Sequence, residues 1–86
     1  MEELDRAARE EMIVDALAEY CRERVPEGRE FRTDRPFFEN GLTSRMLVEI
    51  VVLLRERGIP VSMLDFFRQR TVDRLAATLS DRLANT

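Results

Sequence analysis

The chain has 86 residues, a formal net charge of −3, one cysteine, and neither histidine nor lysine. We therefore expect a single small domain over 1–86 that lacks the side chains of a classical enzyme or a zinc site, and that shows no basic stripe for nucleic acid. No apolar run approaches the roughly 20 residues that span a bilayer, and the unpaired Cys21, an expected core residue, fits a reducing cytoplasm.

The first predicted element is a long amphipathic helix from about Leu4 to Val25, ended by Pro26 and Gly28. Its apolar residues recur at helical spacing: Leu4, Ala8, Met12, Ile13, Ala16, Leu17, Tyr20 and Cys21. A polar connection over 27–43 follows, which is long for a loop without structure of its own. Three phenylalanines are expected to pin it to the core: Phe31, Phe37 and Phe38.

A second helix is predicted from about Ser44 to Arg57, ending at Gly58. Its inward row occupies positions i, i+3, i+4 and i+7: Leu47, Ile50, Val51 and Leu54. Further apolar side chains, Met46, Val48 and Val52, lie on faces that so small a core cannot fully cover. The pattern favours a partner-docking face, and the alternative is that Val48 and Val52 pack under the long connection.

The last third of the chain predicts one short and one longer helix. Ser62 and Asp65 have capping-box spacing, which predicts a brief helix from Met63 to about Phe67. Thr71 is expected to cap a final helix from about Val72 to Leu83. Strand-like alternation is absent from the sequence, so the predicted fold class is all-α: a small four-helix bundle of three main helices and a short third helix. The apolar residues of that short helix are expected in the core rather than around a standing cavity: Met63, Leu64, Phe66 and Phe67. The alternative for Phe67 is a position at a surface or a vacant groove.

The most informative segment is the turn from Phe37 to Ser44, in which Gly41 precedes a serine at the start of an apolar helix. Without histidine or lysine to activate it, Ser44 is expected to be a group that another protein modifies. A helix N-terminus favours an attached anion, and Gly41 permits a close backbone approach. The alternative is that Ser44 only caps the helix, because serine is a preferred N-cap residue.

These residues resemble the acyl and peptidyl carrier proteins of fatty acid, polyketide and nonribosomal peptide synthesis. The resemblance rests on the helix order and on three motifs: Phe37-Phe38-x-x-Gly41-x-x-Ser44, Leu64-x-x-Phe67 and Thr71-Val72. It implies that Ser44 accepts a 4′-phosphopantetheine arm from coenzyme A, transferred by a separate phosphopantetheinyl transferase. The arm holds an acyl, aryl or aminoacyl cargo as a thioester, and the carrier itself catalyses nothing.

Two positions depart from the family pattern, since Thr43 stands where aspartate is usual and Arg45 where leucine is usual. In the family, both neighbours help the transferase to recognise its substrate, and the resemblance therefore leads us to count Gly41, Thr43 and Arg45 with Ser44 as the expected attachment site. We expect Arg45 to pair with the phosphate of the arm.

The resemblance also implies a docking face on the second helix and a space between the second and third helices that can receive a chain. The docking residues are expected to be Met46, Val48, Glu49, Val52, Arg55 and Glu56. This mixed-charge face is more similar to peptidyl or aryl carriers than to the acidic acyl carriers of fatty acid synthesis.

The implied partners are an adenylation or acyltransferase loading enzyme and downstream synthase, condensation or tailoring enzymes. We expect a free-standing, monomeric carrier of specialised biosynthesis. The alternative function is an unmodified, carrier-like helical module that binds a protein.

Overall fold

The computed structural model describes residues 2–85, with side chains for 6–85. Over these residues it is all-α, which confirms the predicted fold class. The elements, in chain order, are α1 (Glu2–Arg22), the 3₁₀ helix η1 (Phe37–Asn40), α2 (Ser44–Glu56), α3 (Met63–Gln69) and α4 (Val72–Ala84).

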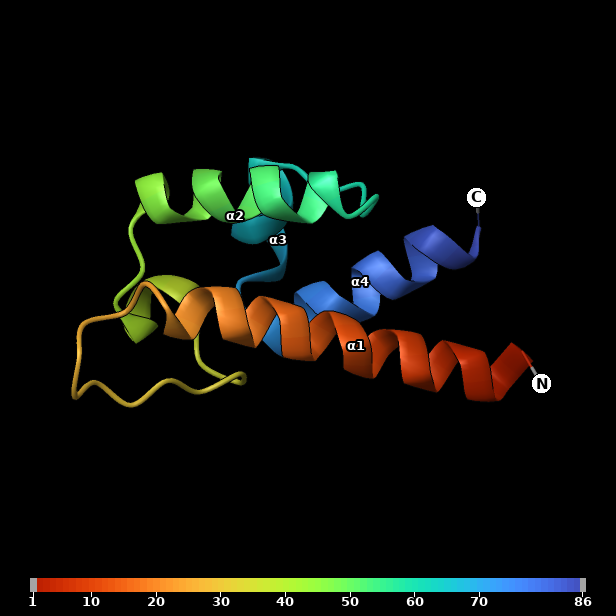
Figure 1. The fold of residues 1–86 in the computed structure, drawn as a ribbon, viewed down its shortest axis with the longest axis horizontal. Helices are drawn as coiled ribbons and strands as arrows, with labels where there is room; N and C mark the ends of the chain where they lie inside the picture. Colours follow the sequence, from red (N-terminus) through yellow and green to blue (C-terminus); the bar gives the residue numbers. More distant parts are fainter. Residues whose placement is uncertain (1, 86) are drawn as a thin grey trace.

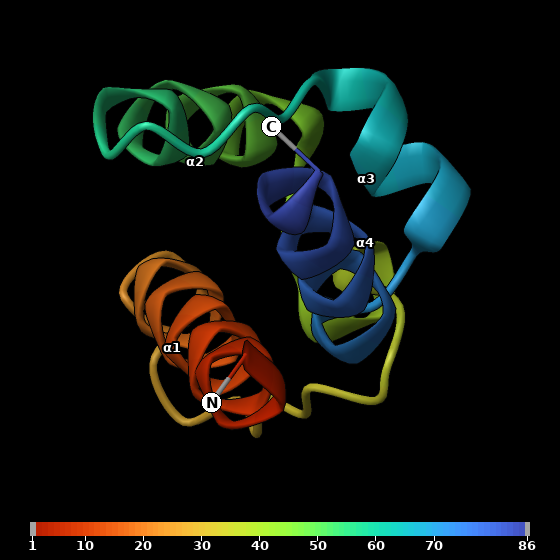
Figure 2. The same ribbon diagram turned by 90° about the vertical axis from the view of Figure 1, so that its right-hand side faces the viewer.

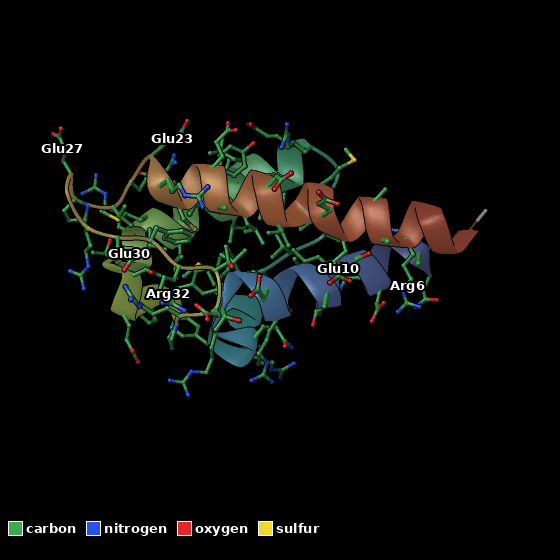
Figure 3. All side chains as sticks on the ribbon, turned by 90° about the horizontal axis from the view of Figure 1, so that it is seen from below. Arg6, Glu10, Glu23, Glu27, Glu30 and Arg32 are labelled. Carbon is green, nitrogen blue, oxygen red and sulfur yellow. The ribbon has the colours of Figure 1, made fainter. Side chains whose placement is uncertain are left out.

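The helix α4 lies in the middle of the bundle, with α1 and α3 on opposite sides of it (Figure 2). The helix α2 lies along the top of this view, next to α3. Figure 1 shows α1 and α4 running in opposite directions, so that both termini lie at one end of the molecule. Arg9 Nε donates to the buried Ser80 hydroxyl at 3.3 Å. Arg6 of α1, labelled in Figure 3, pairs with Asp81 of α4. The core contains Ile13, Leu17, Cys21, Phe37, Leu42, Leu47, Ile50, Val51, Leu54, Val61, Phe66, Val72, Leu75, Ala76 and Leu79.

The first helix ends three residues earlier than predicted, at Arg22 rather than Val25. Proline disfavours the helical conformation in the residue before it, so Pro26 affects Val25 as well as its own position. The N–H groups of Arg24 and Val25 both turn back to the Cys21 carbonyl, each at 3.0 Å, and close the helix as a turn. The predicted apolar residue Leu4 belongs to the part of α1 whose side chains are not described.

The inward row of α2 is confirmed, because all four of its predicted members are buried: Leu47, Ile50, Val51 and Leu54. The helix ends at Glu56, one residue before the predicted end. Arg57 is its C-cap, and Gly58 follows with φ +84°. In the last helix, the Thr71 hydroxyl accepts the Arg74 N–H at 3.1 Å, so the predicted cap of α4 is confirmed.

The connection between α1 and α2 is folded on itself by Asn40, a residue that sequence analysis missed. This side chain is fully buried. Its amide nitrogen donates to the carbonyls of Arg32 (2.9 Å) and Arg35 (3.1 Å), and its oxygen accepts the Arg32 N–H (3.0 Å). Phe37 is buried and Phe31 half-buried, as predicted, whereas Phe38 faces solvent and the prediction for it was wrong.

The short helix α3 extends two residues past its predicted end, to Gln69. Phe66 is buried and Met63 packs partly against the core, but the prediction of core positions for Leu64 and Phe67 was wrong because both are about half-exposed. With only two turns, α3 presents one narrow face to α4, so the side chains on its other face remain in solvent.

Candidate functional site

Ser44 is the first residue of α2, and its side chain is exposed. The cap of this helix is Thr43, whose hydroxyl accepts the Met46 N–H at 3.3 Å. The alternative that Ser44 serves as the N-cap is therefore wrong, because its neighbour has that role. The Ser44 hydroxyl remains available at the surface for chemistry by another protein.

The turn before Ser44 is held by its backbone. Gly41 has φ +96°, a left-handed conformation that favours glycine, and its N–H donates to the Phe38 carbonyl at 3.1 Å. Leu42, directly after it, is buried and anchors the turn to the core. A Cβ at position 41 would lie 3.1 Å from the Arg29 side chain, which crosses the turn and donates to the Glu39 carbonyl at 3.0 Å. The positive φ therefore favours glycine here, and a Cβ would in addition require the flexible Arg29 side chain to shift by a few tenths of an ångström.

The start of α2 is electropositive. Its first turn contains no acidic residue, and the amides of Ser44 and Arg45 have no acceptor among the described residues. Arg45 is exposed and forms no ion pair within 6–85. Free N–H groups, the helix dipole and a neighbouring guanidinium together favour an anion on Ser44.

The predicted docking residues on α2 differ in their surroundings. Val48 and Val52 are half-exposed, so the alternative that they pack under the long connection is wrong. Met46 is partly buried against the core, and Arg24, in the turn after α1, holds Glu49 in an ion pair at 2.9 Å. Arg55 and Glu56 are exposed near the end of the helix. The accessible apolar part of this face therefore consists of Val48 and Val52.

Other reactive groups in the described part of the chain are few. Cys21 is fully buried in the core, as predicted, and burial raises the pKa of its thiol to about 12. A neutral, inaccessible thiol is a poor nucleophile. Among residues 2–85, the His, Cys, Asp and Glu side chains form no group of three suited to a metal ion. The described helices also include none that is long and apolar enough to cross a membrane.

Comparison with known proteins gives one match. The family model described as a phosphopantetheine attachment site matches residues 12–79, which is most of the chain and includes the turn before Ser44. Neither a curated protein nor a solved structure matches the chain. The family match implies a covalently attached 4′-phosphopantetheine and a domain that carries its cargo without catalysing a reaction.

Proposed function

Because the chain belongs to the phosphopantetheine-binding family of carrier domains, we propose that Ser44 is its attachment site. The single observation that carries this assignment is an exposed serine hydroxyl at a helix start that lacks its own anion. The described residues fit the phosphate, since the helix start at Ser44 has two unengaged amides and the next residue, Arg45, has an exposed guanidinium without an ion-pair partner within 6–85.

Attachment needs a phosphopantetheinyl transferase, because the chain has neither histidine nor lysine to activate the Ser44 hydroxyl. Ser44 Oγ attacks the pyrophosphate phosphorus of coenzyme A next to the pantetheine. The new O–P bond forms, the bond to adenosine bisphosphate breaks, and the serine proton goes to a base of the transferase. When bound, the arm supplies a thiol that holds the cargo as a thioester.

We further propose that the cargo is an acyl, aryl or aminoacyl intermediate of polyketide-type or nonribosomal-peptide-type synthesis. The mixed charge of α2 supports this reading, because Arg55 stands beside Glu56 and Glu49 is already paired with Arg24. The partners would be an adenylation or acyltransferase loading enzyme and a downstream synthase, condensation or tailoring enzyme. A buried, unpaired Cys21 is compatible with a monomeric protein of the cytoplasm.

Intact mass spectrometry tests the attachment. We expect one phosphopantetheinyl group to be added after incubation with coenzyme A and a broad-specificity transferase. Ser44→Ala should abolish the addition. Ser62→Ala is the matched control, because Ser62 stands at another helix start and is also exposed, and this variant should accept the arm like the wild type. Addition to Ser44→Ala, or none to the wild type with several transferases, would reject the assignment.

A second candidate function is an unmodified module that binds a protein through α2. The half-exposed Val48 and Val52 favour it, together with the departures from the family pattern at Thr43 and Arg45. Binding that survives Ser44→Ala but is lost in Val52→Asp would support this alternative. Val52 suits the test better than Met46, because Met46 also packs against the core.

A further inference from the structure

Two phenylalanines that were predicted to pack against the core, Phe38 and Phe67, are instead half-exposed and lie next to each other. Phe38 of η1 is 47% exposed and Phe67 of α3 is 49% exposed. Their ring centroids lie 5.7 Å apart with 30° between the ring planes, which is a stacked arrangement. Two exposed aromatic faces from different elements thus meet on one side of the molecule, a few residues before the proposed attachment site.

This pair borders a groove of about 300 Å³ between η1 and the C-terminal half of α3. The buried rings of Phe37 and Phe66, with centroids 4.8 Å apart, also line it. Its volume is at the lower end of ligand pockets, which suits one ring better than a long chain. The lining residues do not include any from α2. The groove is therefore separate from the space between α2 and α3.

Arg70 lines this groove at the end of α3, as does the acidic Glu39 of η1. The backbone of Arg70 has φ +68°, which residues other than glycine seldom adopt. Its carbonyl accepts the Phe37 N–H at 2.8 Å. That bond ties the end of α3 to η1 and so keeps the two walls of the groove together. The Arg70 guanidinium forms no ion pair within 6–85. Guanidinium groups bind favourably over aromatic faces, so the groove suits an aromatic ring more than an aliphatic group.

Ser44 is close enough to deliver such a ring. It follows Phe38 by six residues, so the two Cα atoms are separated by at most about 20 Å. The extended arm is about as long as four to five extended residues, roughly 15 Å, and an aromatic acyl group at its end adds about the length of one to two more, so that the cargo reaches roughly 20 Å. Tethering raises the local concentration of the cargo to about the millimolar range, so even weak stacking is populated.

Building on the proposed function, we propose that this groove holds an aromatic acyl group carried on the arm of Ser44, stacked on Phe38 and Phe67 beside Arg70. The bound cargo would be shielded from solvent until an enzyme withdraws it. The groove thereby favours aromatic acids as the cargo class of this carrier.

The test uses the full chain loaded by a transferase from two coenzyme A thioesters, para-fluorobenzoyl and the non-aromatic cyclohexanecarbonyl. Intact mass first checks that one loaded arm has been added, and the mass of the proteolytic peptide that contains Ser44 checks that the arm is on this residue. The rate of thioester cleavage by hydroxylamine is then measured, together with the fluorine NMR shift of the aromatic cargo. The variants Phe38→Ala and Phe67→Ala each remove one of the two exposed rings that border the groove. The matched control is Leu64→Ala, because Leu64 is an equally exposed apolar residue of α3 that does not line the groove.

We expect the aromatic thioester to be cleaved roughly two- to tenfold faster in Phe38→Ala and Phe67→Ala than in the wild type, with a shift of the fluorine signal. The Leu64→Ala protein and the cyclohexanecarbonyl cargo should show less than about a twofold change. Equal rates in all proteins, or equal protection of both cargoes, would overturn the inference although the arm is attached. If no arm is found on Ser44, the proposed function itself fails.

Discussion

The starts of α2 and α3 are built from similar residues but have opposite electrostatics. At α3, the Asp65 carboxylate accepts the Ser62 N–H at 2.8 Å and pairs with Arg82 through both oxygens, at 2.9 and 3.0 Å. At α2, Thr43 satisfies one N–H, and the first turn contains no acid. The start of α4 is similar to that of α3, because Asp73 lies in its first turn.

This difference shows how a structural helix start is distinguished from one that is suited to modification. A helix N-terminus carries a partial positive charge that an anion stabilises. The protein supplies that anion itself at α3, whereas at α2 the position is open to the phosphate that we propose for Ser44. We therefore expect substitutions at the start of α3 to lower the free energy of unfolding, and substitutions at the start of α2 to change the mobility of the attached arm.

The largest expected effect is on stability at the start of α3. Asp65→Ala removes the bond to Ser62 and leaves the half-buried Arg82 without its carboxylate, so we expect the free energy of unfolding to fall by about 2–3 kcal/mol. The control is Asp73→Ala at the start of α4, which is exposed and should cost about 0.5 kcal/mol. Chemical denaturation measures both, and equal losses would contradict the special role of Asp65.

Acid should weaken the same contact gradually. The hydrogen bond from Arg82 lowers the pKa of Asp65 below its ordinary 3.8. The unfolded chain therefore takes up this proton first, and the stabilisation is complete above about pH 3.8 and is lost as the pH falls toward the lower folded value. We expect Asp65→Asn to flatten the acid limb of a stability–pH curve.

The control for this pH dependence is Asp34→Asn. The Arg32 guanidinium lowers the pKa of the Asp34 carboxyl as well, but that pair is fully exposed and solvent screens it. The acid limb of this variant should therefore stay close to that of the wild type. An acid limb unchanged by Asp65→Asn would show that other carboxylates dominate.

The ends of the two helices differ as well, with a smaller expected effect. Beyond α2, a glycine adopts the positive φ (Gly58, +84°), whereas at the end of α3 an arginine adopts it (Arg70, +68°). Arg70→Gly should raise the melting temperature by relieving strain of about 1 kcal/mol, and Gly58→Ala should lower it by a similar amount. A destabilised Arg70→Gly protein would mean that contacts of the arginine side chain outweigh the strain.

The sequence predicted the features that repeat or that depend on one side chain and its near neighbours. Helical periodicity identified the inward row of α2, and the caps at Thr71 and Ser62 follow from residues three positions apart. Ser44 could be proposed from its motif, and the family match over 12–79 agrees with that motif. Each of these signals lies within about one or two helical turns.

The sequence did not predict the features that depend on contacts between distant segments. Asn40 was missed because its partners are backbone groups up to eight residues away, although a polar side chain among phenylalanines was a usable signal. Phe38 and Phe67 were misplaced because apolar character alone does not show which side of a two-turn helix faces the core. The Asp65–Arg82 pair joins residues of two different helices, which no local pattern indicates.

The smallest expected effect tests the start of α2 directly. Attachment of the arm should raise the free energy of unfolding of the wild type by about 0.5–1 kcal/mol, because the phosphate meets free amides and Arg45. Arg45→Ala should remove part of this gain and loosen the arm in NMR relaxation measurements. The matched control is Arg55→Ala, since Arg55 is an exposed arginine at the far end of α2 and its loss should leave the increase in the free energy of unfolding intact.

High salt should reduce this increase in the wild type, because exposed charges are screened. If arm mobility and the gain were the same in Arg45→Ala as in the wild type, Arg45 would have no role at the phosphate, and the electropositive character of this helix start would rest on its backbone alone.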